Sequence, residues 1–238
     1  LDDISKRAID VIKAADFIIC ENPKHSLKLL NNLGIKKKLI SIHDYNEHSV
    51  IKRIGDDLKN KLFVLISDAG SPLISDPGYR LIQHCIKNKI NITSIPGASS
   101  LIPALQLSGL PINEFVFKGF LPKTKIQISS FINKIKKNEK TVIFFVSSHR
   151  LSMCLDLMSQ IIPNRNISIS KELTKINEKI YRGLPEKIKS QLSTDNKTFK
   201  GEFVIVVGEN KLKKSESIDL EVLNSQITKL LSKFSLTD

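Results

Sequence analysis

The sequence lacks three features that would each have assigned it a class. It has no apolar run as long as a membrane span, no Cys-x-x-Cys pair, and neither a Gly-x-Gly nor a Gly-x4-Gly-Lys-Ser/Thr motif. These absences argue against a membrane helix, a structural zinc site, and the standard dinucleotide-binding and P-loop folds. No signal peptide is visible, and because residue 1 is Leu we expect the sequence to start inside a longer natural chain. Three scattered cysteines (Cys20, Cys85 and Cys154) favour the reducing cytoplasm.

Arginine is also scarce, although the chain is strongly basic. Only six of the 37 basic residues are Arg, and the formal net charge is +13. Such a charge favours a polyanionic partner such as nucleic acid. An AT-rich genome, which enriches Lys, Asn and Ile, would produce the same excess of lysine. The charge is therefore supporting evidence for RNA binding and no more.

The first half of the chain alternates short apolar runs with helical patterns. The predicted strands are 17–20, 38–42, 62–66 and 90–95, and the predicted helices are 24–33, 48–60 and 77–88, after a first helix with Asp3 as its N-cap. Asp76 and Pro77 read as the N-cap and first position of the last of these helices. The alternation predicts an α/β domain over residues 1–110 whose mostly parallel sheet is doubly wound.

At residues 108–125, Gly and Pro interrupt the alternation of strands and helices, which is typical of a domain junction. The second half has predicted strands at 141–146, 166–170, 177–183 and 202–208, and predicted helices at 125–138, 150–161 and 185–192. The close spacing of the strands near 166–183 suggests a hairpin, so we expect a mixed sheet in an α/β domain over 111–210. Residues 211–238 read as a basic connector and a helix at 218–234.

An irregular loop follows the third predicted strand. Residues 67–78, "SDAGSPLISDPG", leave the carboxyl end of the run "LFVLI", which is the edge where open α/β sheets bind ligands. A loop of this kind is by itself more often a connector than a site. A second small-residue loop, "SIPGASS" at 94–100, also follows a predicted strand. Two such loops predict a backbone-lined pocket for a flat, polar cofactor.

These loops and five further stretches carry a resemblance that runs from residue 1 to about residue 208. The stretches are "SDAGSPLISDPGY", "IPGASS", "SGLP" with "FKGFLPK", "FFVSSHRL", "KELTKINEKIYRG" and "KGEFVIVV", in that order. Together they resemble the small-subunit ribosomal RNA (cytidine-2′-O)-methyltransferases of the tetrapyrrole methylase superfamily. "HDYNE" at 43–47 is similar to that family's His-Asp-His-Asn-Glu stretch, with Tyr45 in the third place.

The resemblance implies two α/β domains with S-adenosylmethionine in the cleft between them, methyl transfer to RNA, and a homodimer. It places three groups of residues on the cofactor: Asp68, Ala69, Gly70, Ser71 and Pro72 on the first loop, Ser99 and Ser100 on the second, and Phe145 with Val146 on a strand of the second domain. Core packing is an equal alternative for the last two side chains. No metal is implied.

The transfer requires a ribose 2′-hydroxyl to attack the methyl group while one proton is removed. By resemblance, the catalytic candidates are Glu21, Asp44 and Glu172. The substrate-binding candidates, which face the RNA of the small ribosomal subunit, are Lys24, His43, Asn46, Lys123, Arg150 and Lys175. Helix entry and capping are the alternative roles for the residues near 43–46, and the start of a helix is the alternative for Arg150.

The chain also departs from the family pattern. "ENPK" at 21–24 stands where Glu-Asp-Thr-Arg is usual, and replacement of Arg by Lys removes a bidentate fork suited to phosphate. The family's first strand falls before residue 1, and most of its C-terminal helical extension falls beyond residue 238. Two alternatives therefore stay open: a methylase of the same superfamily that acts on a tetrapyrrole, and a catalytically decayed protein that still binds RNA.

Overall fold

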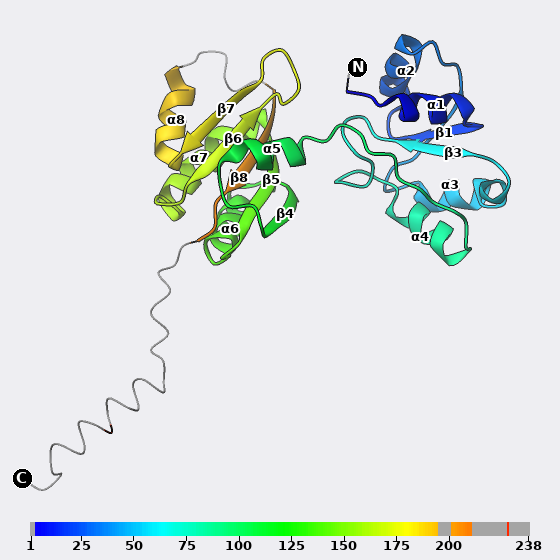
Figure 1. The fold of residues 1–238 in the computed structure, drawn as a ribbon. Helices are drawn as coiled ribbons and strands as arrows, with labels where there is room; N and C mark the ends of the chain where they lie inside the picture. The colour runs from blue at the N-terminus through cyan, green and yellow to red at the C-terminus, as the bar shows by residue number, and fades with distance from the viewer. Residues whose placement is uncertain (1–2, 195–200, 211–227, 229–238) are drawn as a thin grey trace, which may run out of the picture. The chain divides into compact units, whose positions relative to one another are not determined.

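The computed structural model describes residues 3–194, 201–210 and 228, which divide into two compact units. The first unit comprises residues 1–107 and 172–178, and the second comprises 108–171 and 179–238. Each unit has its own sheet and its own hydrophobic core (Figure 1). The connector and helix predicted for 211–238 lie outside the described residues, except for Thr228.

The first unit is built on a parallel sheet of three strands in the order β2-β1-β3. The strands are β1 (Phe17–Cys20), β2 (Lys38–Ser41) and β3 (Phe63–Ile66). The helices are α1 (Lys6–Ala14), α2 (Pro23–Asn32), α3 (Glu47–Ile54) and α4 (Tyr79–Lys87), with a 3-10 turn at Asp57–Lys59. Helix α5 (Leu101–Ser108) runs across the boundary of the two units at residues 107 and 108.

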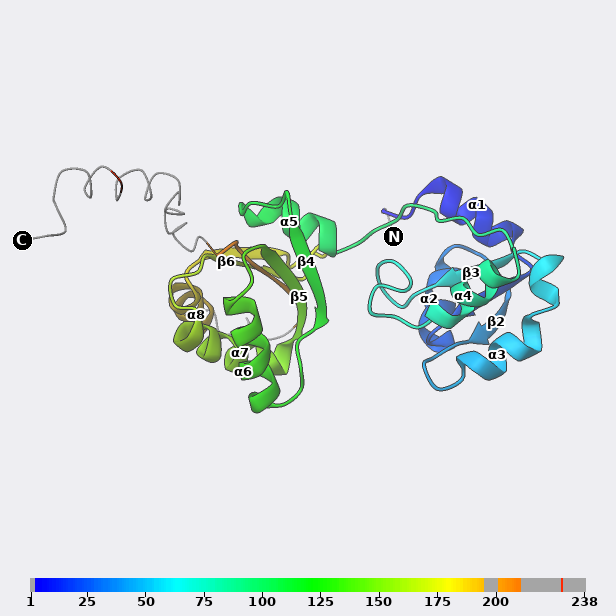
Figure 2. The ribbon, with the colours of Figure 1, turned by 90° about the horizontal axis from the view of Figure 1, so that it is seen from below.

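Helices cover both faces of this sheet, as Figures 1 and 2 show. The central strand β1 explains the arrangement, because its alternate side chains point to opposite faces. Ile18 packs with Ile12 of α1 and Leu30 of α2, whereas Ile19 packs with Val50 of α3 and Leu81 of α4. A strand buried on both faces must be apolar throughout, which is why "FIIC" carries no polar alternation.

Three expectations for this unit are wrong. Residues 90–95 form no strand: Ile90 packs on the α3–α4 side, but residues 91–94 are exposed and pair with no strand that the structure describes. The N-cap of α1 is Ser5, whose Oγ accepts a hydrogen bond from the Ala8 amide at 3.1 Å, and not Asp3. The N-cap of α4 is Gly78 rather than Asp76. Its φ of +122° and its packing against Leu65 suit only glycine.

The second unit has a mixed sheet of five strands in the order β4-β5-β8-β6-β7. The strands are β4 (Phe115–Phe120), β5 (Thr141–Ser147), β6 (Ile167–Lys171), β7 (Lys179–Gly183) and β8 (Glu202–Val207). The pair β4–β5 is parallel and the other pairs are antiparallel, including the predicted hairpin of β6 and β7. The fold expected from the sequence, two α/β domains with a parallel and a mixed sheet, is thus confirmed.

Three helices lie on one face of the mixed sheet (Figures 1 and 2). They are α6 (Lys125–Lys136), α7 (Ser148–Ile161) and α8 (Pro185–Thr194). Alternate residues of β5, namely Val142, Phe144 and Val146, form the core with them. A capping box of Thr124 and Gln127 fixes the start of α6 directly after the "FLPK" stretch.

Candidate active site

The loop at residues 67–78 connects β3 to α4 and lies at the carboxyl edge of the parallel sheet. Two hydrogen bonds shape its beginning. The Ser67 hydroxyl donates to the Gly70 carbonyl at 2.9 Å, and the Asn22 amide donates to Asp68 Oδ1 at 3.3 Å. The second bond ties this loop to the segment that follows β1, so the ends of two neighbouring strands are joined at one place.

Four residues of this loop have positive φ: Gly70 (+75°), Leu73 (+73°), Ser75 (+68°) and Gly78 (+122°). Two of them carry side chains, for which such backbone angles cost free energy. Strained conformations of this kind concentrate where a backbone must take one particular shape around a ligand. In the described part of the chain, Glu172 and Thr174, in the loop between β6 and β7, are also non-glycine residues with positive φ.

Carboxylates gather beside the loop. Glu21 follows β1, Asp68 begins the loop, and Asp76 lies near its end; Glu21 and Asp76 line one depression together with Ser67 and Pro72. Burial, and then the negative charges of Glu21 and Asp68, raise the pKa of Asp76 from 3.8 to about 6. Asp76 Oδ2 is buried and has no hydrogen-bond partner in the structure. This edge therefore attracts a cation, or a donor of hydrogen bonds.

Sequence reasoning treated Asp76 as a helix cap and missed its place among these carboxylates. The signal was present, since "SDAGSPLISDPG" contains a second Asp in a loop already assigned to the cofactor. The sequence could not show that Glu21, 55 positions away, lies close enough to raise the Asp76 pKa.

Asp76→Asn is expected to stabilise the folded protein at pH 7 and to weaken S-adenosylmethionine binding. The folded-state pKa of about 6 lies above the ordinary 3.8, so the folded state holds the proton more tightly. The wild type consequently loses stability as the pH rises through this range, and the amide removes that loss. Urea unfolding of both proteins at pH 5 and 7.5 tests this: the advantage of Asn should shrink at pH 5. An equal difference at both pH values would contradict it.

The turn after β2 contains three predicted site residues. The side chain of Asn46 holds the turn together: its Oδ1 accepts from the His43 amide at 2.8 Å and its Nδ2 donates to the Ser41 carbonyl at 3.2 Å. His43 and Asp44 are exposed, and the His43 ring lies 6.3 Å from the ring of Tyr45 between centroids. The turn precedes α3, so it lies at the same carboxyl edge as the 67–78 loop.

Ser99 and Ser100, the predicted cofactor residues of the second loop, come after residues 90–95, which form no strand. Ser99 Oγ accepts a weak hydrogen bond from the Leu101 amide at 3.4 Å, and the Ser100 carbonyl accepts from the Ala104 amide at 3.1 Å. These contacts start α5. Ala69 and Gly70 of the first loop are exposed, and Ser71 and Pro72 are half-buried.

The second unit holds four predicted site residues. Val146 is buried in the core, so only its backbone could meet a ligand. Phe145 is half-buried, and its ring lies 5.1 and 5.2 Å from those of Phe117 and Phe120. The guanidinium of Arg150 donates to the carbonyls of residues 121 and 122, which favours a structural role. Lys123 is exposed.

Two predicted residues pair with each other in the loop between β6 and β7. Lys175 Nζ lies 3.0 Å from Glu172 Oε1, and the Glu172 side chain is 19% exposed. Lys24 is exposed in the first turn of α2, where its amide donates to the Asn22 side chain that caps the helix. The structure thus brings together Glu21, Asp68, the 67–78 loop and the 43–46 turn at one edge of the first unit.

The described residues offer no cluster of His, Cys, Asp and Glu that could hold a metal ion. They contain no helix long and apolar enough to cross a membrane. Cys20, Cys85 and Cys154 are free and buried, and burial raises the pKa of each thiol.

Known proteins resemble this chain in both sequence and fold. The profile of the Tetrapyrrole (Corrin/Porphyrin) Methylases matches residues 1–189. Ribosomal RNA small subunit methyltransferase I of Halalkalibacterium halodurans is 43% identical over 211 residues, covering 88% of this chain and 72% of the relative. The enzyme of the same name from Mesomycoplasma conjunctivae is 42% identical over 221 residues, covering 92% and 89%.

Among solved structures, diphthine synthase gives a TM-score of 0.62 at 14% identity, covering 87% of this chain and 85% of that one. Uroporphyrin-III-C-methyltransferase from Thermus thermophilus gives 0.54 at 15% identity, covering 87% and 88%. At such low identity, these two similarities concern the fold alone.

Proposed function

Because the chain belongs to the family of ribosomal RNA small subunit methyltransferases I, within the tetrapyrrole methylases, we propose that it methylates the ribose 2′-oxygen of a cytidine in small-subunit ribosomal RNA. The observation that carries the proposal is the identity of 42% with a relative of that name over 92% of this chain. The family uses S-adenosylmethionine as methyl donor. The sugar position and the base come from the resemblance of the motifs.

The edge formed by the 67–78 loop fits this cofactor. When bound, S-adenosylmethionine supplies an electrophilic methyl group on a positively charged sulfur. Glu21, Asp68 and Asp76 offer negative charge, and the orphaned Asp76 Oδ2 offers an acceptor for an ammonium or hydroxyl group. The exposed backbone around Gly70 can approach a ligand closely because no Cβ stands in the way. That the cofactor lies between the two domains stays a prediction.

The protein must also accept the proton of the attacking hydroxyl. Of the three candidate proton acceptors, Asp44 has the fewest interactions, since it is exposed and no described residue hydrogen-bonds to its side chain. Glu21 lines the same depression as Asp76, so its carboxylate is better placed to orient the cofactor. Glu172 is held by Lys175, which suits a positioning role.

Lys24, His43 and Lys123 are exposed and can contact the RNA backbone. Lys175 is engaged with Glu172, Asn46 with its own turn, and Arg150 with two carbonyls, which leaves them fewer donors for a substrate. A homodimer and a cytoplasmic location belong to the same proposal. The free, buried cysteines suit that compartment.

The two alternatives have less support. The tetrapyrrole enzyme named above shares 15% identity with this chain, far below the 43% of an RNA methyltransferase. The altered "ENPK" stretch, which suggested a decayed enzyme, forms a regular helix start: Asn22 caps α2 and Pro23 occupies its first turn.

We expect the full chain to transfer methyl groups to small ribosomal subunits and much less to a short duplex of the same sequence. A target nucleotide must leave its stack, at a cost of a few kcal/mol, and the bent backbone of an assembled particle offsets part of that cost. Incorporation of labelled methyl from S-adenosylmethionine measures both rates. Labelling of a free tetrapyrrole instead would favour the small-molecule methylase, and binding of particles without transfer would favour a decayed enzyme.

A further inference from the structure

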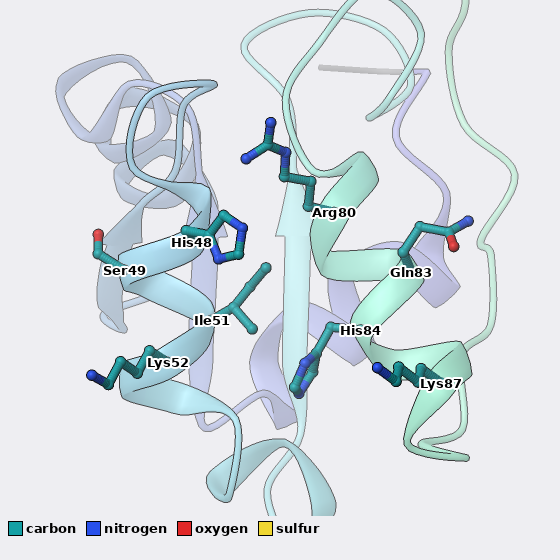
Figure 3. A pocket seen from close by; sticks show the side chains of 8 residues that line it. All are labelled: His48, Ser49, Ile51, Lys52, Arg80, Gln83, His84 and Lys87. Atoms are coloured by element: carbon teal, nitrogen blue, oxygen red, sulfur yellow. The ribbon is translucent and has the colours of Figure 1, made fainter.

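A basic groove lies between α3 and α4 on the face of the first unit. It has a volume of about 730 Å³, and we call it the α3–α4 groove. Its lining comprises His48, Ser49, Ile51, Lys52, Arg80, Gln83, His84 and Lys87. Figure 3 shows His48 and Ile51 of α3 and His84 of α4 pointing into the space between the two helices. No residue of this groove belongs to the methyl-transfer site described above.

The groove has cations without matching anions. Helices α3 and α4 together carry four Lys or Arg residues, and their single acidic residue, Glu47, is buried with only 4% exposure. Lys52, Arg80 and Lys87 make no ion pair with any residue that the structure describes. Elsewhere on the surface, Lys61, Lys140 and Lys189 each lie within about 3.0 Å of a carboxylate. A genome-wide excess of lysine does not explain a groove from which carboxylates are absent.

The dimensions favour an extended polyanion over a single small anion. Arg80, His84 and Lys87 repeat at helical spacing along one face of α4, and at 1.5 Å per residue Arg80 and Lys87 lie about 10 Å apart along the axis. His48 and Lys52 repeat in the same way on α3. Gln83, Ser49 and the side chains of His48 and His84 add further hydrogen-bonding groups, which RNA-binding surfaces use on phosphate and sugar.

The groove also begins where the substrate must be. α3 follows the 43–46 turn and α4 follows the 67–78 loop, so both helices start at the carboxyl edge of the sheet. Their N-termini carry partial positive charge toward that edge. An RNA strand with one nucleotide at the 67–78 loop can therefore continue along the groove.

We propose that the α3–α4 groove binds the phosphate backbone of the small-subunit RNA next to the nucleotide that is methylated. The proposal rests on the proposed function in that the bound polyanion is the RNA substrate. The groove increases the affinity for RNA and fixes the position of the strand on the protein. It does not select a sequence, because contacts to phosphate carry no sequence information.

The test compares two triple variants with the same change of charge. Lys52→Glu/Arg80→Glu/Lys87→Glu alters the groove, and Lys6→Glu/Arg7→Glu/Lys13→Glu alters exposed positions of α1, on the opposite face of the sheet. Filter binding of each full-length protein to small ribosomal subunits and to naked small-subunit RNA is measured from 50 to 300 mM salt. Calorimetry with S-adenosylmethionine and circular dichroism report whether the cofactor site and the fold are retained.

The groove variant should lose at least ~10-fold in affinity for both RNA targets at 100 mM salt, and its slope of log affinity against log salt should flatten by about 2 to 3, because three phosphate contacts are lost. The α1 variant should keep a slope close to wild type, and both variants should keep wild-type cofactor affinity. Equal losses in the two variants would overturn the proposal, and so would a groove variant that binds naked RNA normally but not the particle, because a ribosomal protein would then be the partner.

Failure of this inference is distinguishable from failure of the proposed function. If the wild-type protein methylates subunits but both triple variants bind them equally well, only the proposed role of the groove is wrong. Wild-type protein that binds through the groove but transfers no methyl group contradicts only the methyltransferase, and leaves the groove as an RNA-binding surface.

Discussion

Gly70→Val is expected to reduce S-adenosylmethionine affinity by about 100-fold while the rest of the fold persists. Gly70 has a φ of +75°, which a β-branched residue adopts only at high cost. Apart from its two chain neighbours, no described residue has an atom within 4 Å of the position that its Cβ would occupy, so the substitution acts by moving the backbone rather than by a clash. Loss of two backbone hydrogen bonds to a ligand, at about 1–1.5 kcal/mol each, corresponds to that change in affinity. Titration calorimetry on the folded variant measures it.

Gly34→Val provides the matched control. Gly34 follows α2, has a φ of +67°, and among described residues likewise has only its chain neighbours within 4 Å of its Cβ position. The two variants should lose similar stability in urea, but only Gly70→Val should lose the cofactor. Wild-type affinity in a folded Gly70→Val protein would remove the 67–78 loop from the site.

Arg165→Met is expected to lower the free energy of unfolding of the second unit by about 3 kcal/mol. The Arg165 side chain is buried, with 7% exposure, and donates to three carbonyls of different elements. Its Nη1 lies 2.7 Å from the Ile135 carbonyl at the end of α6, its Nε lies 2.9 Å from the Gly208 carbonyl after β8, and Nη2 also reaches Lys140. Methionine leaves these acceptors without that donor, at about 1–3 kcal/mol for each buried group. Urea unfolding followed by circular dichroism measures the loss.

Arg165→Lys should restore only part of this stability, because an ammonium group lacks the planar fork that reaches several carbonyls at once. Arg7→Met, at an exposed position of α1, should stay within about 0.5 kcal/mol of wild type. A wild-type unfolding midpoint in Arg165→Met would show that this guanidinium does not hold the three elements together.

The strands that the sequence predicted best are those with uninterrupted apolar runs. β1 matches its prediction residue for residue, because burial on both faces demands apolar side chains throughout. Residues 90–95, "INITSI", alternate Ile with polar residues as a half-buried strand would, but they pair with no strand that the structure describes, and pairing is not visible in one segment alone. β4 lies inside the stretch 108–125 that was predicted as a junction because Gly and Pro interrupt it. In the structure Gly119, with a φ of +67°, lies at a shift in register between Phe117 and Phe120.

At the candidate site, too, the sequence predicted local features but not the contacts between residues far apart in the chain. Motif and spacing predicted a loop at 67–78 that leaves the carboxyl edge of the sheet, because the alternation of strand and helix is a local pattern and parallel strands end at one edge. The pairing of Asn22 with Asp68 and the charge cluster around Asp76 depend on contacts between separate strands. Arg150 had the right charge for a phosphate, yet two carbonyls hold it, and only the fold could reveal that contact.

If this chain methylates a ribose of small-subunit ribosomal RNA, as proposed, the position of the new methyl group will show it. Small subunits incubated with the full chain and labelled S-adenosylmethionine are digested to nucleosides, which mass spectrometry then resolves. The expected product is a cytidine whose ribose carries the methyl group and whose base is unmodified. A methyl group on the base, or no labelled nucleoside from particles that the protein binds, would contradict it.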